Sequence, residues 1–378
     1  MIYLDYAATT PLDKEVQASY QDLLTNHFFN ADSMYDAGLQ VARYMEKSRE
    51  LLGQMLQCNS EELIFTSCGS EANNLAIKGV AFQYANRGKH IITTSVEHSS
   101  VYEACRQLET VFGFEVDYLT VDKYGCVSLE DLKNKLREDT ILVSIMCVNN
   151  EVGSFNDLKA IKKILQDYPK VIFHSDMVQA LTKVAIDLNV VDLASFSAHK
   201  IHGLKGSGLL YKSKKIQLVS LISGGQQEFN IRGGTSDACT NIVFAKTLRL
   251  AMDDFKQKQS HVNFLNDYTR QKLTDLQDVV INTKKECSSN AIINFSCIGY
   301  KPEVIMHALE ANNIYLSTRS ACSSKTESVS RVMKQLGLDE DIASSAMRIS
   351  FGSETTMEQI DEFIYYLKES LIKTRKKR

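Results

Sequence analysis

Lys200 is the residue whose surroundings most strongly suggest covalent chemistry. It lies in residues 195–208, where an apolar strand pattern ends in polar residues and continues into a glycine-rich loop. Open α/β sheets bind ligands at the carboxyl ends of their strands, and an unpaired ammonium buried there is costly. Because desolvation lowers the pKa of a lysine, its neutral amine can attack a carbonyl and form a Schiff base. We therefore predict that Lys200 carries a carbonyl-containing ligand, with an exposed structural charge as the alternative.

Two more polar residues follow the strand pattern that begins at residue 171. Asp176, at its end, is either the N-cap of a helix or the partner of a protonated pyridine nitrogen that makes the ring an electron sink. Gln179, one turn later, is placed to donate a hydrogen bond to an oxygen of the same ring. The pair therefore favours a pyridine-like ligand.

Further polar side chains follow other strand patterns. Ser70 stands where a strand and a turn of small residues lead into a helix, so the free N–H groups of the helix N-terminus suit a phosphate, although a plain capping motif fits as well. His98 follows a strand and is either structural or a proton carrier stacked on a cofactor ring. The polar run 149–153 closes another strand. Together these residues predict one rim that binds a phosphorylated, pyridine-like ligand.

Alternating strand and helix patterns between about residues 60 and 215 must position these side chains. The strand candidates are aliphatic or β-branched and lie at 91–95, 141–148, 171–174, 193–197 and 208–211. Amphipathic helix patterns lie between them, at 73–85, 129–137 and 158–167. This alternation predicts a mainly parallel sheet with helices on both faces.

The pattern changes after about residue 240. A long charged helix pattern runs from Ile242 to about Leu276, and further strand candidates follow at 291–295 and 347–351. We predict an α/β protein with a large domain over residues 14–250, and a smaller α/β domain formed by residues 1–13 and 251–378.

The composition excludes several classes of protein. With a formal net charge of −3, the chain has no broad basic surface for nucleic acid. No apolar stretch approaches the ~18–20 residues that span a bilayer, and the N-terminus lacks the basic and apolar regions of a secretory signal. Nine cysteines without regular CxxC spacing argue against a disulfide scaffold or a structural zinc site. We expect a cytoplasmic protein without a bound metal.

The sequence resembles the cysteine desulfurases of the NifS/IscS-like group, in the class V aminotransferase family. The matching motifs extend over nearly the whole chain, at residues 3–11, 94–98, 148–153, 195–208, 232–235 and 319–324. The resemblance implies the PLP-dependent transferase fold of the aspartate aminotransferase type (fold type I). It also implies a homodimer that uses pyridoxal 5′-phosphate (PLP).

The resemblance further implies a role for each candidate residue. PLP forms a Schiff base with Lys200, Asp176 contacts the pyridine nitrogen and Gln179 the ring hydroxyl, and His98 stacks on the ring as an acid and base. The implied phosphate contacts are Ser70, the backbone at Gly69, Ser197, His199 and, across the dimer interface, Thr235. Asn150 and Arg348 would hold the substrate carboxylate, with Asn150 also near the cofactor. The planar guanidinium of Arg348 suits bidentate capture, and a structural salt bridge is the alternative.

Cys322 matches the sulfur-accepting nucleophile of the family, and its polar loop suits a thiolate that must move. The implied reaction converts L-cysteine to L-alanine and leaves the sulfur on Cys322 as a persulfide. A selenocysteine lyase, or another PLP amino-acid lyase, is the alternative. Arg319 stands where relatives often have glycine. We hypothesise that its charge lowers the pKa of Cys322, against the alternative of a solvated loop arginine.

The identity of the sulfur acceptor is less constrained. After the last helix pattern, 357–371, only a short basic stub remains, whereas longer relatives carry a C-terminal extension that helps to dock an iron–sulfur scaffold. We therefore expect a tRNA sulfurtransferase or an iron–sulfur scaffold as the acceptor protein, with the short stub favouring the sulfurtransferase. A protein that holds PLP only for binding or regulation is disfavoured, because it need keep none of the four residues Lys200, Asp176, His98 and Cys322.

Overall fold

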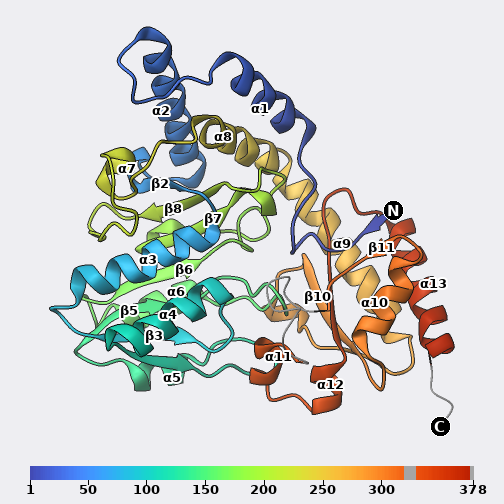
Figure 1. The fold of residues 1–378 in the computed structure, drawn as a ribbon. Helices are drawn as coiled ribbons and strands as arrows, with labels where there is room; N and C mark the ends of the chain where they lie inside the picture. Colours follow the sequence, from blue (N-terminus) through green and yellow to red (C-terminus); the bar gives the residue numbers. More distant parts are fainter. Residues whose placement is uncertain (319–328, 375–378) are drawn as a thin grey trace.

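A seven-stranded sheet forms the centre of the computed structural model, which describes residues 1–318 and 329–374 (Figure 1). The strand order is β2-β8-β7-β6-β5-β3-β4; β8 is antiparallel to both its neighbours, and the other pairs are parallel. The strands are β2 (Leu63–Thr66), β3 (His90–Thr94), β4 (Glu115–Leu119), β5 (Thr140–Ser144), β6 (Ile172–Asp176), β7 (Leu193–Ser197) and β8 (Gly208–Lys212). The predicted mainly parallel sheet is confirmed.

One predicted strand is shorter than expected. The pattern at 141–148 predicts eight residues, but β5 ends at Ser144. The backbone N–H groups of Ile145 and Cys147 still donate to the carbonyls of His174 and Asp176, at 3.1 and 2.9 Å. The apolar pattern therefore continues beside β6 without regular strand pairing, which brings residues 149 and 150 to the end of the sheet.

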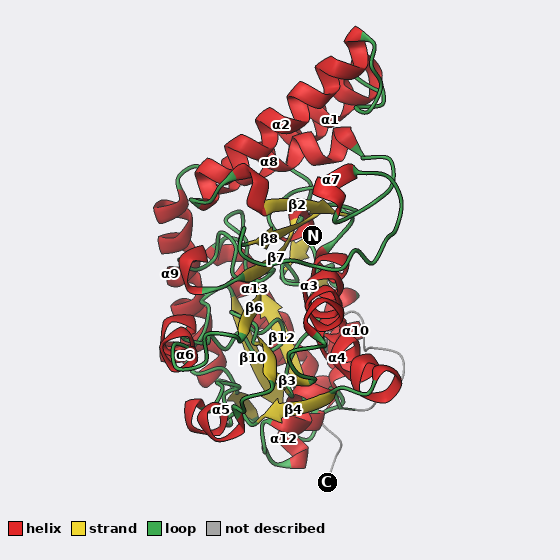
Figure 2. Cartoon of the chain, turned by 90° about the vertical axis from the view of Figure 1, so that its left-hand side faces the viewer, coloured by secondary structure: helices red, strands yellow, loops and turns green. Residues whose placement is uncertain are grey.

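Helices cover both faces of this sheet (Figure 2). The helices on one face are α3 (Gly69–Tyr84) and α4 (Ser99–Phe112). Those on the other face are α2 (Asp36–Leu56), α5 (Leu129–Lys135), α6 (Leu158–Leu165) and α8 (Ala238–Met252). Every residue of β5, β6 and β7 is buried, as expected for parallel strands that lie between two helical layers.

The single long helix predicted from Ile242 to about Leu276 is wrong. The chain instead forms α8 and α9 (Phe255–Thr274), separated by Asp253 and Asp254. Asp254 has a left-handed backbone conformation with φ 55°, which short polar side chains tolerate and a helix interior does not. The break lies close to the predicted domain boundary at residue 250, which stays a prediction.

A second, smaller α/β region follows the break. Its antiparallel sheet has the order β12-β10-β9, and the N-terminal strand β1 (Ile2–Tyr3) pairs in parallel with β11 (Ile314–Tyr315). The three strands of the sheet are β9 (Val279–Ile281), β10 (Ile292–Cys297) and β12 (Ala346–Ser350). The other α-helices among the described residues are α1 (Lys14–Asn26), α7 (Gln227–Asn230), α10 (Pro302–Glu310), α11 (Arg331–Gln335), α12 (Glu340–Ser344) and α13 (Met357–Thr374). None of the helices in the described part of the chain is long and apolar enough to cross a membrane.

Candidate active site

Lys200 lies just beyond the carboxyl end of β7, in the short 3-10 helix Ala198–Lys200. Its Nζ donates hydrogen bonds to the carbonyl oxygens of Ala7 and Ala8, at 2.7 and 2.6 Å. The N-terminal segment therefore runs directly beside the candidate lysine. Sequence reasoning missed these two partners, because a backbone carbonyl carries no residue-type signal.

A cavity of about 270 Å³ opens beside Lys200 at the carboxyl ends of the parallel strands. It is lined by ten of the residues singled out in the sequence: Gly69, Ser70, His98, Asn150, Asp176, Gln179, Ser197, His199, Lys200 and Arg348. These residues come from six separate stretches of sequence. Nine of them end or follow strands of the large sheet, where the carboxyl ends of parallel strands share one edge; Arg348 comes instead from β12 of the smaller sheet.

One predicted site residue in the described part of the chain does not line this cavity. Thr235 is exposed in the loop between α7 and α8, and its predicted role requires a second chain. Cys322 lies outside the described residues, and so does Arg319. The predictions for these three residues stay predictions.

Asp176 is buried at the end of β6 and accepts two hydrogen bonds. Its Oδ1 accepts from the backbone N–H of Val178 at 2.9 Å, and its Oδ2 accepts from Nδ2 of Asn73 at 2.7 Å. No helix begins at Asp176, because residues 178–183 form turns. The N-cap alternative is therefore wrong, and the carboxylate instead closes a turn and lines the cavity. Asn73 was missed, although it stands on the same helix as Ser70 and faces the sheet.

His98 is the N-cap of α4, and its Nδ1 accepts a hydrogen bond from the backbone N–H of Ser100 at 3.2 Å. The proton of the neutral ring therefore resides on Nε2. Burial lowers the pKa of His98; Asp176 opposes this shift, and the positive charges of Lys200 and Arg331 reinforce it. The imidazole is thus neutral near pH 7 and able to accept a proton.

The N-terminus of α3 forms one end of the cavity. No side chain caps this helix, whose first residue is Gly69, so its N–H groups suit an anion such as a phosphate. A Cβ atom at Gly69 would lie 2.9 Å from Cγ2 of Val178, which is closer than real Cβ contacts allow. Glycine is therefore required for the helix to start this close to the strand ends.

Two further residues from the end of β7 lie at the same part of the cavity. Ser197 is buried, and its Oγ makes only a long hydrogen bond of 3.5 Å to the carbonyl of Ser207. The ring of His199 contacts Oγ1 of Thr9 through Nδ1 at 3.1 Å. Burial, followed by the charges of nearby lysines, lowers the pKa of His199 to about 4. Its contribution to binding an anion is thus a hydrogen bond from a neutral ring.

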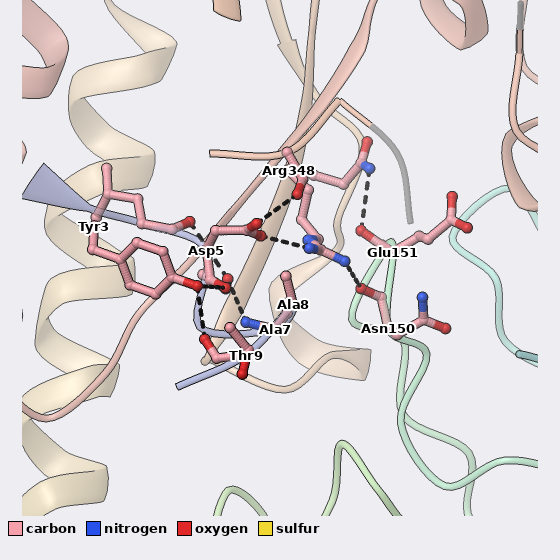
Figure 3. Close-up of polar contacts among 12 residues, drawn as sticks. Tyr3, Asp5, Ala7, Ala8, Thr9, Asn150, Glu151 and Arg348 are labelled. Atoms are coloured by element: carbon pink, nitrogen blue, oxygen red, sulfur yellow. Dashed lines mark hydrogen bonds and ion pairs between the residues drawn. The ribbon is translucent and has the colours of Figure 1, made fainter. Parts of the chain in front are cut away.

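Arg348 lies on β12 and also lines the cavity, and Figure 3 shows its polar contacts. Its Nη2 donates to Oδ1 of Asp5 at 2.6 Å, and its Nη1 donates to the backbone carbonyl of Asn150 at 2.7 Å. The structural salt bridge weighed from the sequence is therefore present. Two contacts use only part of the five N–H groups of a guanidinium, so Arg348 retains donors for a substrate carboxylate. Asp5 was missed as a functional candidate despite its place in the motif at residues 3–11.

Residues 2–363 match the aminotransferase class-V family. The chain belongs to this family. Two curated relatives cover nearly the whole chain. One is the "NifS/IcsS protein homolog" of Lactobacillus delbrueckii, 40% identical over 96% of this chain and 95% of the relative. The other is the cysteine desulfurase IscS of Dictyoglomus turgidum, 39% identical over 99% of this chain and 95% of the relative.

The fold agrees with a solved structure described as a NifS-like protein, for which no organism is named. The two share 33% sequence identity and superpose with a TM-score of 0.93, over 98% of this chain and 99% of that one. The predicted family, type I fold and desulfurase class are therefore confirmed. The likeness covers both the large sheet and the smaller α/β region.

Class-V aminotransferases depend on PLP, and the residues of the cavity fit this cofactor. The uncapped start of α3 and the close approach at Gly69 provide space and N–H donors for a phosphate. At the other end of the group, the buried carboxylate of Asp176 suits a protonated pyridine nitrogen. Lys200 lines the same cavity and would supply the amine that PLP requires.

Proposed function

We propose that this chain is a PLP-dependent cysteine desulfurase that converts L-cysteine to L-alanine and passes the sulfur to Cys322 as a persulfide. The observation that carries the proposal is one cavity that combines Lys200, Asp176, His98 and Arg348. The names of the curated relatives support cysteine as the substrate.

Each wall of the cavity has a separate task in this proposal. Lys200 holds the cofactor, Asp176 keeps its pyridine nitrogen protonated and Gln179 donates to the ring oxygen. The backbone of Gly69 and the side chains of Ser70, Ser197 and His199 would hold the phosphate, and His98 would stack on the ring. Bound PLP supplies an electron sink for the electrons released at the substrate α-carbon.

The protein's own groups then position the substrate and move its protons. Arg348 and Asn150 hold the substrate carboxylate, which orients the α-carbon toward Lys200. The amine of Lys200 removes the α-proton, and His98 is a second group able to exchange protons because its ring is neutral. The Cys322 thiolate then attacks the substrate sulfur. The S–S bond of the persulfide forms as the bond between the substrate sulfur and its β-carbon breaks. The β-carbon keeps the electron pair and takes up a proton, and return of a proton to the α-carbon gives alanine.

The dimer is also part of the proposal, with Thr235 completing the phosphate site of a second chain. Thr235 is exposed in a single chain. The tip between α1 and α2 extends from the body of the molecule (Figures 1 and 2). It exposes Phe28, Met34 and Tyr35, with 67%, 86% and 55% of each residue accessible. Apolar surface of this kind supports burial against another protein, and sedimentation of the holoenzyme tests it.

A cytoplasmic location and a protein acceptor, either a tRNA sulfurtransferase or an iron–sulfur scaffold, complete the proposal. Incubation of the persulfide form with each class of acceptor in turn would show which one removes the sulfur. Transfer to the scaffold alone would contradict the preference for the sulfurtransferase.

The main experiment combines absorbance with mass spectrometry. The holoenzyme should show a visible cofactor band that changes on addition of L-cysteine, and Cys322 should gain the mass of one sulfur atom. Cys322→Ala should lose alanine formation from cysteine but retain it better from selenocysteine; equal retention of both would favour the selenocysteine lyase.

A separate experiment tests the hypothesis that the charge of Arg319 lowers the pKa of Cys322. It measures alkylation of Cys322 across pH in wild type and Arg319→Ala, and superimposable profiles would refute the hypothesis.

A further inference from the structure

Lys183 contacts the candidate active site from outside the cavity. It stands four residues after Gln179, and its Nζ donates a hydrogen bond to Oε1 of Gln179 at 2.6 Å. It lines a second cavity of about 250 Å³, which Lys200 also lines. Neither the reaction nor the proposed cofactor contacts assign Lys183 a role.

The side-chain amide of Gln179 has a second partner that fixes its orientation. Its Nε2 donates to the carbonyl oxygen of Ala7 at 2.8 Å, and the same oxygen accepts from Lys200 at 2.7 Å. An ammonium only donates hydrogen bonds and a backbone carbonyl only accepts them. A flipped amide would therefore place its NH₂ against the ammonium of Lys183 and its oxygen against the carbonyl of Ala7, which are two repulsive contacts.

We propose that Lys183 is a positioning residue: it holds the Gln179 amide so that an N–H group, and not the carbonyl oxygen, is available to the ring oxygen of the cofactor. The inference rests on the proposed contact between Gln179 and that oxygen. One of the two hydrogens on Nε2 binds Ala7, and the other remains for the cofactor. Gln179 itself is buried, with 3% of its surface exposed, so water does not satisfy a misplaced amide.

The environment of Lys183 agrees with a specific role. Burial, followed by the positive charges of Lys200 and Arg348, lowers the pKa of Lys183 to about 7. Below this pKa Lys183 is a buried ammonium that needs an acceptor, and above it the neutral amine still has N–H groups to donate; the oxygen of Gln179 is the acceptor. The contact therefore gives the buried Lys183 an acceptor and fixes the orientation of the Gln179 amide.

The test is a pH titration of the visible absorbance of the holoenzyme, which follows deprotonation of the Schiff base on Lys200. When the Schiff-base nitrogen is deprotonated, the ring oxygen keeps its full negative charge. A hydrogen bond to that oxygen is then stronger, so it favours the deprotonated Schiff base and lowers its pKa. We expect Lys183→Met to raise the pKa of this transition by about one unit, since the donor to the ring oxygen is lost. Lys183→Arg, which keeps a donor-only cation, should restore the wild-type titration.

The matched control is Lys258→Met. Lys258 lines the same second cavity, and its Nζ donates to the carbonyl of Leu250 at 2.8 Å, without contacting Gln179. Its replacement should leave the absorbance titration unchanged. A shift in this variant as large as that of Lys183→Met would show that any lost charge in the cavity suffices, and would overturn the inference.

A double-mutant cycle with Gln179→Ala separates the two proposals. Gln179→Ala should raise the pKa of the transition by itself, and adding Lys183→Met should then change it little. If Gln179→Ala has no effect, the proposed contact to the ring oxygen fails. If Gln179→Ala raises the pKa but Lys183→Met does not, positioning by Lys183 fails. It also fails if Lys183→Met shifts the pKa equally in the wild-type protein and in the Gln179→Ala variant.

Discussion

Asp5 and Arg348 stand 343 positions apart in the sequence, yet Oδ1 of Asp5 accepts a hydrogen bond from Nη2 of Arg348 at 2.6 Å (Figure 3). The side chain of Arg348 is 3% exposed and that of Asp5 is 16% exposed. The other carboxylate oxygen of Asp5 accepts from Oγ of Ser317 at 2.8 Å. One acidic side chain thus orients the proposed substrate-binding arginine and ties it to the chain after β11.

We expect Asp5→Asn to raise KM for L-cysteine by about ten-fold with a much smaller change in kcat, because hydrogen bonds to charged groups contribute about 1.5–3 kcal/mol. Steady-state kinetics measures both constants. Asp253→Asn is a suitable control, since Asp253 pairs with Arg249 on the exposed surface. A lowered kcat at unchanged KM would contradict a role in holding the substrate.

Gly69→Ala should weaken PLP binding, because the added methyl group collides with Cγ2 of Val178 and displaces the helix start from the phosphate. An increase of about ten-fold in Kd corresponds to the loss of one good hydrogen bond to a charged group. Cofactor titration followed by absorbance or fluorescence measures it.

The double variant Gly69→Ala/Val178→Ala removes the colliding methyl and should recover most of the lost affinity. Gly79→Ala is a control within the same helix, where the added atom meets Leu218 instead. Equal losses of PLP affinity at Gly69 and Gly79 would point to a general effect on helix α3 rather than to the cofactor site.

Glu97 should make the protein less stable as the pH rises. Burial, assisted by the nearby charge of Asp176, raises the pKa of this carboxyl to about 8. Between its ordinary pKa of about 4.5 and pH 8, the folded protein holds a proton that the unfolded chain has released. The free energy of unfolding should therefore fall by up to about 1.4 kcal/mol per pH unit in this window.

Glu97→Gln removes this titration and should flatten the dependence, as measured by denaturant unfolding at pH 5, 6.5 and 8. The control is Glu103→Gln, at an exposed position. Parallel pH profiles of wild type and Glu97→Gln would show that Glu97 does not hold the proton.

Glu228 anchors the loop that carries Thr235. Its two oxygens accept from both terminal nitrogens of Arg49, at 2.8 and 2.9 Å, and one of them also accepts from the backbone N–H of Phe65. Removing one partner of a buried pair leaves the other charge uncompensated, so Glu228→Ala should lower the free energy of unfolding by about 3–5 kcal/mol. Glu103→Ala, which loses the exposed pair with Arg106, should cost less than about 1 kcal/mol. Chemical denaturation of both variants checks the difference.

The sequence predicted the strand ends of the active site well, for a physical reason. Lys200 and Asp176 each follow an apolar strand pattern, and the carboxyl ends of parallel strands necessarily meet at one edge. The helix break at Asp253 and Asp254 was not predictable in the same way, because the charged pattern continues through it. A left-handed aspartate leaves hardly any compositional signal.

The remaining contacts of the site could not be predicted from residue types. The carbonyls of Ala7 and Ala8 act through the backbone. The N-terminal segment is held beside Lys200 by the pairing of β1 with β11 and by the contacts of Ala7 with Ser350 and of Thr10 with His199. Lys183 stands four residues after Gln179, but a lysine at that spacing is usually solvated. Only its contact with Oε1 of Gln179 distinguishes it.

The pairing of the N-terminal segment with β11 and β12 has a consequence for folding during synthesis. Residues 5–10 leave the ribosome first, but the partners of Asp5 follow more than 300 residues later. Such long-range contacts form slowly, because a long loop must close before they stabilise the chain. The helices and strands of the central sheet can assemble earlier, so a nascent chain would already present Lys200 while its carbonyl partners were still undocked. Measuring PLP binding by ribosome-bound chains of increasing length would show at which length the N-terminal segment docks beside Lys200.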